Sequence, residues 1–103
     1  MQLDSRIPAK VKVGGLTFIV EADEALIHES SYQGTKSTTT GRIRLSPQLP
    51  PNLQCSTFLH ELIHALADEM HLGLKEETVQ RLEFGLFQVL ADNNLFFGAR
   101  EQG

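Results

Sequence analysis

The sequence predicts an α+β fold, in which a small antiparallel sheet built on a hairpin packs against an antiparallel pair of helices. Three observations support this prediction. Apolar residues alternate with polar ones on both sides of Gly14-Gly15, as they do in a β-hairpin. The apolar spacing becomes helical after Pro50-Pro51. All expected strands precede both expected helices, an order that favours α+β over a wound α/β fold.

The first half of the chain predicts three strands. The hairpin strands are expected over about residues 10–13 and 16–22, and the Gly-Gly loop suits a turn with positive φ at both positions. Ile43 and Leu45 alternate with arginines and predict a third short strand. Residues 28–41 are polar and rich in Ser, Thr and Gly, which indicates a long loop or a weak hairpin.

The second half predicts two helices. Asn52 is the expected N-cap of the first, which ends near His71 with Gly73 suited to the C-terminal cap. Its expected buried arc consists of Cys55, Phe58, Leu59, Leu62, Ile63, Leu66 and Met70. The second helix is expected from about Lys75 to residues 92–94, with Phe96-Phe97 folding back onto the core. Its expected apolar stripe consists of Val79, Leu82, Leu86, Val89 and Leu90.

Length and composition restrict the classes of protein to consider. We expect 103 residues to form a single domain, residues 1–103. The net charge of −4 has the wrong sign for a nucleic-acid partner, and no apolar run has the roughly 20 residues of a membrane span. With Cys55 as the lone cysteine and no signal-peptide pattern at the N-terminus, we expect a cytoplasmic location.

The pentapeptide His60-Glu61-Leu62-Ile63-His64 is a HExxH motif. Imidazoles at positions i and i+4 share one helical face and reach one metal ion. The glutamate next to the first histidine is placed to take a proton from metal-bound water. We therefore predict a Zn²⁺ site with His60 and His64 as ligands and Glu61 as the catalytic base.

A catalytic zinc site normally has a third protein ligand. If the second helix returns antiparallel, at about 1.5 Å per residue the position level with the two histidines falls roughly eight or nine residues into it, at Glu83. Glu83 also lies within the apolar stripe, where an unpaired carboxylate is costly to bury. Glu76 and Glu77 are the alternatives and rank second, because the helix dipole already accounts for acids in a first turn.

The HExxH motif followed after eighteen residues by Glu83 resembles the gluzincin pattern of zinc metallopeptidases. At this length the chain resembles the single-domain minigluzincins and the ImmA/IrrE-like proteins of bacteria and phages. The resemblance implies a zincin-like fold, His60, His64 and Glu83 as zinc ligands, and Glu61 as catalytic base. It also suggests that an edge strand, placed here at 42–46, binds a peptide or protein substrate by strand addition.

Other polar residues receive weaker assignments. Asp68 is a candidate to orient a ligating imidazole, and Tyr32, His28 and His71 are candidates to stabilise an oxyanion. His71 lies too far from His64 to share its metal, and Cys55 is expected to be a buried thiol. The functional prediction is a zinc metallopeptidase that hydrolyses peptide bonds through metal-activated water. The alternative is a weakly active or inactive zincin scaffold that acts as a protein-interaction module.

Overall fold

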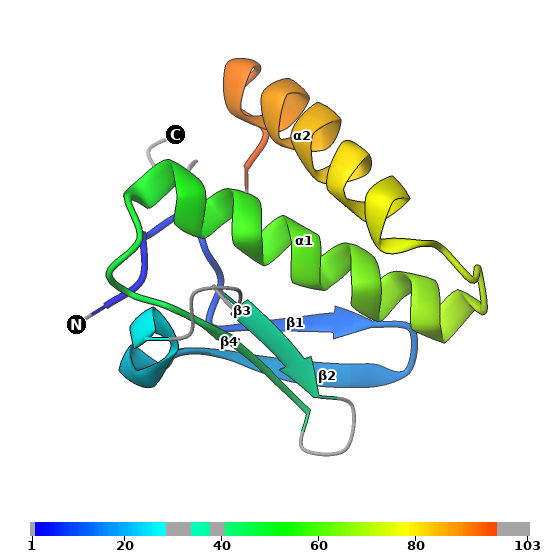
Figure 1. Ribbon diagram of the computed structural model, residues 1–103, viewed down its shortest axis with the longest axis horizontal. Helices are drawn as coiled ribbons and strands as arrows, with labels where there is room; N and C mark the ends of the chain where they lie inside the picture. The colour runs from blue at the N-terminus through cyan, green and yellow to red at the C-terminus, as the bar shows by residue number, and fades with distance from the viewer. Residues whose placement is uncertain (1, 29–33, 38–40, 97–103) are drawn as a thin grey trace.

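The chain folds into three layers, in which a sheet, helix α1 and helix α2 are stacked in that order (Figure 1). A computed structural model describes residues 2–28, 34–37 and 41–96. The strands are β1 (Lys10–Val13), β2 (Leu16–Ala22), β3 (Gly34–Ser37) and β4 (Arg42–Leu45). A short 3-10 helix, η1, spans Glu24–His28, and the two long helices are α1 (Pro51–Met70) and α2 (Glu76–Asp92). The predicted α+β class is confirmed.

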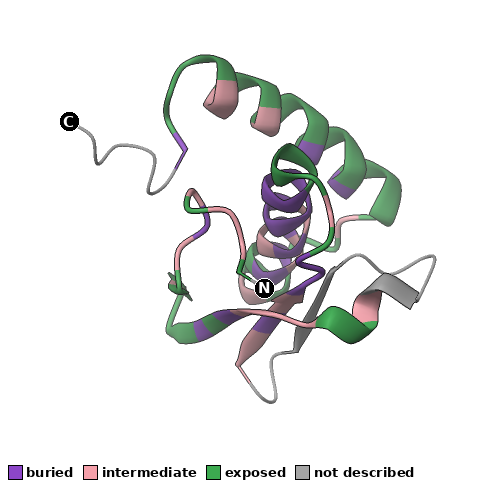
Figure 2. Ribbon diagram, turned by 90° about the vertical axis from the view of Figure 1, so that its left-hand side faces the viewer, coloured by how far each residue is buried: buried purple, intermediate pink, exposed green. Residues whose placement is uncertain are grey.

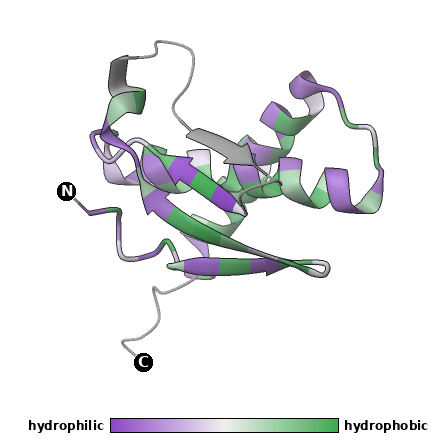
Figure 3. Cartoon of the chain, turned by 90° about the horizontal axis from the view of Figure 1, so that it is seen from below, coloured by the Kyte–Doolittle hydropathy of each residue, from purple (hydrophilic) through white to green (hydrophobic). Residues whose placement is uncertain are grey.

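The sheet has the strand order β1-β2-β4-β3. The predicted hairpin of β1 and β2 is confirmed, and its strands alternate hydrophobic and hydrophilic residues (Figure 3). Gly14 has positive φ (61°) and Gly15 does not, so the expectation of positive φ at both turn positions is wrong. The expectation of a purely antiparallel sheet is also wrong, because β4 pairs parallel to β2. The chain passes through η1 and β3 before β4, so β4 re-enters the sheet in the direction of β2.

The polar segment 28–41 contains strand β3, in addition to the three strands that were expected. Strand β3 pairs antiparallel with β4, which confirms the hairpin alternative for this segment, while residues 29–33 and 38–40 lie outside the described residues. Because β3 covers one side of β4 and β2 the other, the expectation that residues 42–46 form an edge strand is wrong. Among the described residues, β1 and β3 are the edge strands of the sheet.

Helix α1 begins earlier than expected, whereas its expected end near His71 is confirmed. It begins at Pro51, and the N-cap residue is Pro50 rather than Asn52, with no side-chain cap. Proline suits the first helical position because the N–H that it lacks would have no intrahelical partner. Asn52 instead accepts a hydrogen bond of 2.9 Å from Nη2 of Arg6. At the other end the C-cap is His71, in the left-handed conformation (φ 56°), and Gly73, the expected cap, also has positive φ (64°) two residues later.

The core lies between the sheet and α1. Its largest fully buried side chains include Phe18, Ile43 and Leu45 from the sheet and Phe58 from α1. Part of the expected arc on α1 is wrong, since Leu66 and Met70 are 48% and 59% exposed and Ala65 and Ala67 are buried instead. The sheet covers α1 on one side and α2 covers it on another, so its buried residues do not form a single arc.

Helix α2 lies on the side of α1 away from the sheet and runs back along it (Figure 1). Only Val79 and Glu83 of this helix are buried (Figure 2). The expectation that Leu82, Leu86 and Val89 are buried is therefore wrong; each is more than 40% exposed. These side chains remain exposed because α2 packs on one helix and not on the sheet.

The chain returns to the core after α2. Phe96 is 4% exposed and joins the core cluster, which confirms the expectation for this residue, while Phe97 lies outside the described part of the chain. The rings of Phe87 and Phe96 pack edge to face at 5.7 Å between centroids. None of the described helices has the length and apolar composition required to cross a membrane.

Candidate metal centre

The two histidines of the HExxH motif lie one turn apart on α1, on the side that faces α2. Their ring centroids are 4.9 Å apart. The side chain of His60 is 17% exposed and that of His64 is 32% exposed. Ile63, between them, is buried and anchors this part of the helix in the interior. The motif is therefore helical, as its spacing requires, and presents both imidazoles on one face.

Glu76 connects the two imidazoles. Its Oε2 lies 2.9 Å from Nε2 of His60, and its Oε1 lies 2.8 Å from Nε2 of His64. One ligand atom from each of the three residues falls within 4.8 Å of the others, as in groups that bind a metal ion. Glu76 is in the first turn of α2, which the linker of residues 71–75 brings back beside α1. The structure thus brings together His60, His64 and the alternative ligand Glu76.

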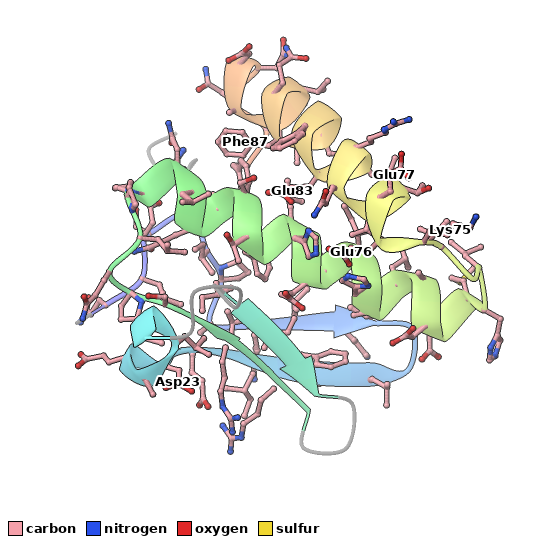
Figure 4. The ribbon with its side chains drawn as sticks, in the orientation of Figure 1. Asp23, Lys75, Glu76, Glu77, Glu83 and Phe87 are labelled. Carbon is pink, nitrogen blue, oxygen red and sulfur yellow. The ribbon has the colours of Figure 1, made fainter. Side chains whose placement is uncertain are left out.

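Glu83 lies on the other side of the His60 ring. Its Oε1 is 2.9 Å from Nδ1 of His60, and its Oε2 accepts a hydrogen bond from the hydroxyl of Ser56. Glu83 and Glu76 are seven residues apart, so they share one face of α2, and both project toward α1 (Figure 4). The antiparallel return correctly placed Glu83 beside His60. Its carboxylate contacts Nδ1 of His60, whereas Glu76 contacts the Nε2 atoms of both histidines.

Glu77, the remaining glutamate of the first turn of α2, does not join the cluster. Its side chain is 71% exposed and forms an ion pair of 3.0 Å with Arg81, one turn further along the helix. Figure 4 shows it pointing away from α1, in contrast to Glu76. The structure therefore separates the two neighbouring candidates, and only Glu76 faces the histidines.

Glu61 is a buried residue of α1, at 9% exposure. It adjoins His60 in sequence and lies in the same helical segment as both imidazoles. The residue is therefore largely shielded from solvent within the HExxH motif. Its position is therefore compatible with proton transfer at this site.

Two of the four remaining candidates, His71 and Asp68, are described with their side chains. His71 is exposed at the end of α1, and Asp68 is exposed on the same helix. The backbone of His28 is in η1, but its side chain and the whole of Tyr32 lie outside the described residues.

Cys55 is fully buried, and its Sγ lies 3.9 Å from Oδ1 of Asp4. Burial raises the pKa of the Cys55 thiol to about 11. At neutral pH the side chain is therefore a protonated thiol, as expected for a small buried residue rather than a nucleophile.

Ser56 was missed by the reasoning from sequence. It is 7% exposed and lies four residues before His60, so it shares the face of α1 that carries the histidines. This spacing was the available signal. A hydroxyl one turn before His60 can reach the same carboxylate that contacts the His60 ring, which here is that of Glu83.

A sheet followed by a HExxH helix and a glutamate-bearing helix, with imidazoles and carboxylates meeting between the helices, is the arrangement of a metallopeptidase-like domain. Residues 17–84, more than half of the chain, match the Peptidase M78 family of IrrE N-terminal-like domains. The chain belongs to this family, which confirms the resemblance to ImmA/IrrE-like proteins. No curated protein and no solved structure matches the chain significantly.

Proposed function

We propose that the protein is a zinc-dependent metallopeptidase whose metal ligands are His60, His64 and Glu76. The observation that carries this proposal is the convergence of two imidazole Nε2 atoms on the carboxylate of Glu76, with all three ligand atoms within 4.8 Å of one another. Two imidazoles and one carboxylate, with a further coordination position open, make up a common ligand set of catalytic zinc sites. The donor chemistry therefore fits zinc.

This assignment replaces Glu83 by Glu76 as the third ligand. Glu76 contacts the Nε2 atoms of both histidines, whereas Glu83 contacts Nδ1 of His60 alone. The two nitrogens of one imidazole point in different directions, so one ion bound by both histidines through Nε2 is next to Glu76 and not next to Glu83. The geometry thus favours the alternative that ranked second on sequence grounds.

Zinc, when bound, supplies a Lewis acid that lowers the pKa of water and polarises a peptide carbonyl. Glu61 is the proposed general base: its carboxylate accepts the proton of the attacking water and passes it to the leaving amine. His60 and His64 hold their positions because α1 is anchored by its buried side. The proposed reaction is hydrolysis of a peptide bond.

The proposed substrate is an extended peptide. Strand β3 is an edge strand of the described sheet and contacts α1, the helix that carries the motif. An edge strand has unpaired backbone groups that bind an extended chain by strand addition. We therefore assign substrate binding to β3 rather than to residues 42–46.

The test uses Glu61→Gln, with Glu77→Gln as a matched control because Glu77 is exposed and paired with Arg81. We expect Glu61→Gln to retain one equivalent of zinc, measured by elemental analysis, and to lose at least about 100-fold in the rate of cleavage of a peptide library. Glu77→Gln should cleave like the parent. Parent-like cleavage by Glu61→Gln would contradict the mechanism, and a parent protein without zinc affinity would contradict the metal site.

A second candidate function is a zinc-bearing protein-interaction module without turnover. The observation in its favour is the apolar surface of α2, on which Phe84 is 69% exposed and Val89 is 45% exposed. The same assay separates the two candidates. If the protein with one equivalent of zinc cleaves no member of a broad peptide library, the interaction module is favoured.

A further inference from the structure

Hydrogen bonds among Ser56, Glu83 and His60 join the two helices on the side of His60 away from Glu76. The hydroxyl of Ser56 donates to Oε2 of Glu83, and Oε1 of Glu83 lies 2.9 Å from Nδ1 of His60. Ser56 and His60 are one turn apart on α1, while Glu83 comes from α2. These hydrogen bonds link the imidazole of His60 to Glu83 on α2 and, through Glu83, to Ser56 on α1.

Glu83 is in an unfavourable place for a charged side chain. It is 9% exposed, and the only other buried residue of α2 is Val79. Burying a carboxylate is costly unless its oxygens find partners, and an apolar residue commonly packs at such a position with no loss of stability. Both oxygens of Glu83 have partners, and these partners are His60 and Ser56. The carboxylate of Glu83 therefore provides hydrogen bonds to His60 and Ser56 that an apolar residue cannot provide.

We propose that Glu83, held by Ser56, is a positioning residue that fixes the ring and the tautomer of His60. When Nδ1–H donates to Glu83, the lone pair of Nε2 is directed toward His64 and Glu76. A histidine that binds a metal through one nitrogen commonly donates its other N–H to a carboxylate, which fixes the ring and raises its basicity. This inference rests on the proposed metal site, and it gives Glu83 a different role from that of a ligand.

The first test measures the zinc dissociation constant of each variant by competition with a chelator. We expect Glu83→Ala to weaken zinc binding about 10–100-fold, the usual cost of losing such a partner. Glu83→Gln should remain within a few-fold of the parent, because its amide oxygen still accepts from Nδ1–H and its NH₂ donates to Ser56. Glu76→Gln should lose more affinity than Glu83→Ala, and Glu77→Gln should lose none.

The second test asks whether Ser56 acts through Glu83. We expect Ser56→Ala to weaken zinc binding by a few-fold, and Ser56→Ala combined with Glu83→Ala to bind no more weakly than Glu83→Ala alone. In the zinc-loaded protein, NMR should detect a slowly exchanging Nδ1 proton on His60. That signal should persist in Glu83→Gln and disappear both in Glu83→Ala and in Glu83→Met, whose side chain has a similar length but no acceptor for Nδ1–H. A role in packing alone would leave Glu83→Met like the parent.

Three outcomes separate the possible failures. If Glu83→Ala binds zinc as tightly as the parent, the positioning role is wrong while the metal site stands. If Glu83→Gln loses as much affinity as Glu76→Gln, Glu83 is a ligand and the inference is overturned. If the parent itself binds no zinc, both the proposed function and this inference are overturned. Thermal unfolding in excess chelator establishes that each variant is folded.

Discussion

The imidazole of His60 lies between two carboxylates from the same face of one helix. Glu76 is beside its Nε2 and Glu83 is beside its Nδ1, each at 2.9 Å. The two glutamates are seven positions apart, and their proposed roles differ because each contacts a different nitrogen of His60. The orientation of the His60 ring therefore decides which glutamate meets which nitrogen. The number of residues between a glutamate and the histidine does not decide this.

Cys55 provides a prediction at the same scale. Burial raises its pKa to about 11 from an ordinary value of 9.0, so at pH 8 the folded protein holds about 100-fold less thiolate than an exposed cysteine. We expect alkylation by iodoacetamide at pH 8 to be at least about 100-fold slower in the folded protein than in urea.

The pH dependence of stability gives a further check on Cys55. The unfolded thiol ionises before the folded one, so its contribution to stability is complete below about pH 9 and falls as the pH rises toward 11. Cys55→Ala should lack this loss of stability. Rapid alkylation of the folded protein at pH 8 would show that the thiol is accessible and ionised.

Helix α2 is weakly buried for an element that supplies a proposed metal ligand. Of its 17 residues, only Val79 and Glu83 are buried. Its remaining links to α1 include the contacts of Glu76 with both histidines. An element with few buried apolar contacts opens at low free energy, and a ligand that binds only the closed form stabilises it. The metal is therefore expected to hold α2 in place.

This reasoning predicts a difference in amide hydrogen exchange between the two forms of the protein. Removal of zinc by a chelator should speed exchange in residues 76–92 by about 10-fold or more, and should leave β2 and the first turns of α1 nearly unchanged. Glu76→Gln should give the fast pattern with or without zinc. Equal protection of α2 in both forms would mean that apolar packing alone holds the helix.

At the scale of the whole molecule, stability is concentrated between the sheet and α1. The core residues Phe18, Ile43, Leu45 and Phe58 are all at most 1% exposed, whereas Leu82, Leu86 and Val89 on α2 are more than 40% exposed. The site therefore has one rigid wall, formed by α1 on the sheet, and one wall with few buried contacts, formed by α2.

A pair of alanine substitutions tests this distribution. Phe18→Ala should lower the free energy of unfolding by about 3–5 kcal/mol, because it removes a ring that is 1% exposed. Leu86→Ala, at 41% exposure, should cost less than about 1 kcal/mol. Urea unfolding followed by circular dichroism measures both. Similar losses for the two variants would show that α2 shares the main core.

The features that depend on local spacing were predictable from the sequence. The β1–β2 hairpin follows from alternation around Gly14-Gly15, and the HExxH helix follows from helical period and the i, i+4 spacing of His60 and His64. These relations involve residues within a turn or two of one another, so they hold wherever the element packs. The family resemblance depended on the same short motif.

The long-range features became visible only in the tertiary structure. It placed β4 parallel to β2 and inside the sheet, which alternation cannot reveal because alternation does not depend on strand direction. It also placed Glu76 at both Nε2 atoms and Glu83 at Nδ1. Counting residues put Glu83 at the correct level along α1, but the nitrogen that each acid meets depends on how α2 crosses α1. The crossing of the two helices depends on the linker of residues 71–75 and on packing between the helices. Neither of these leaves a periodic pattern of residues from which it could be predicted.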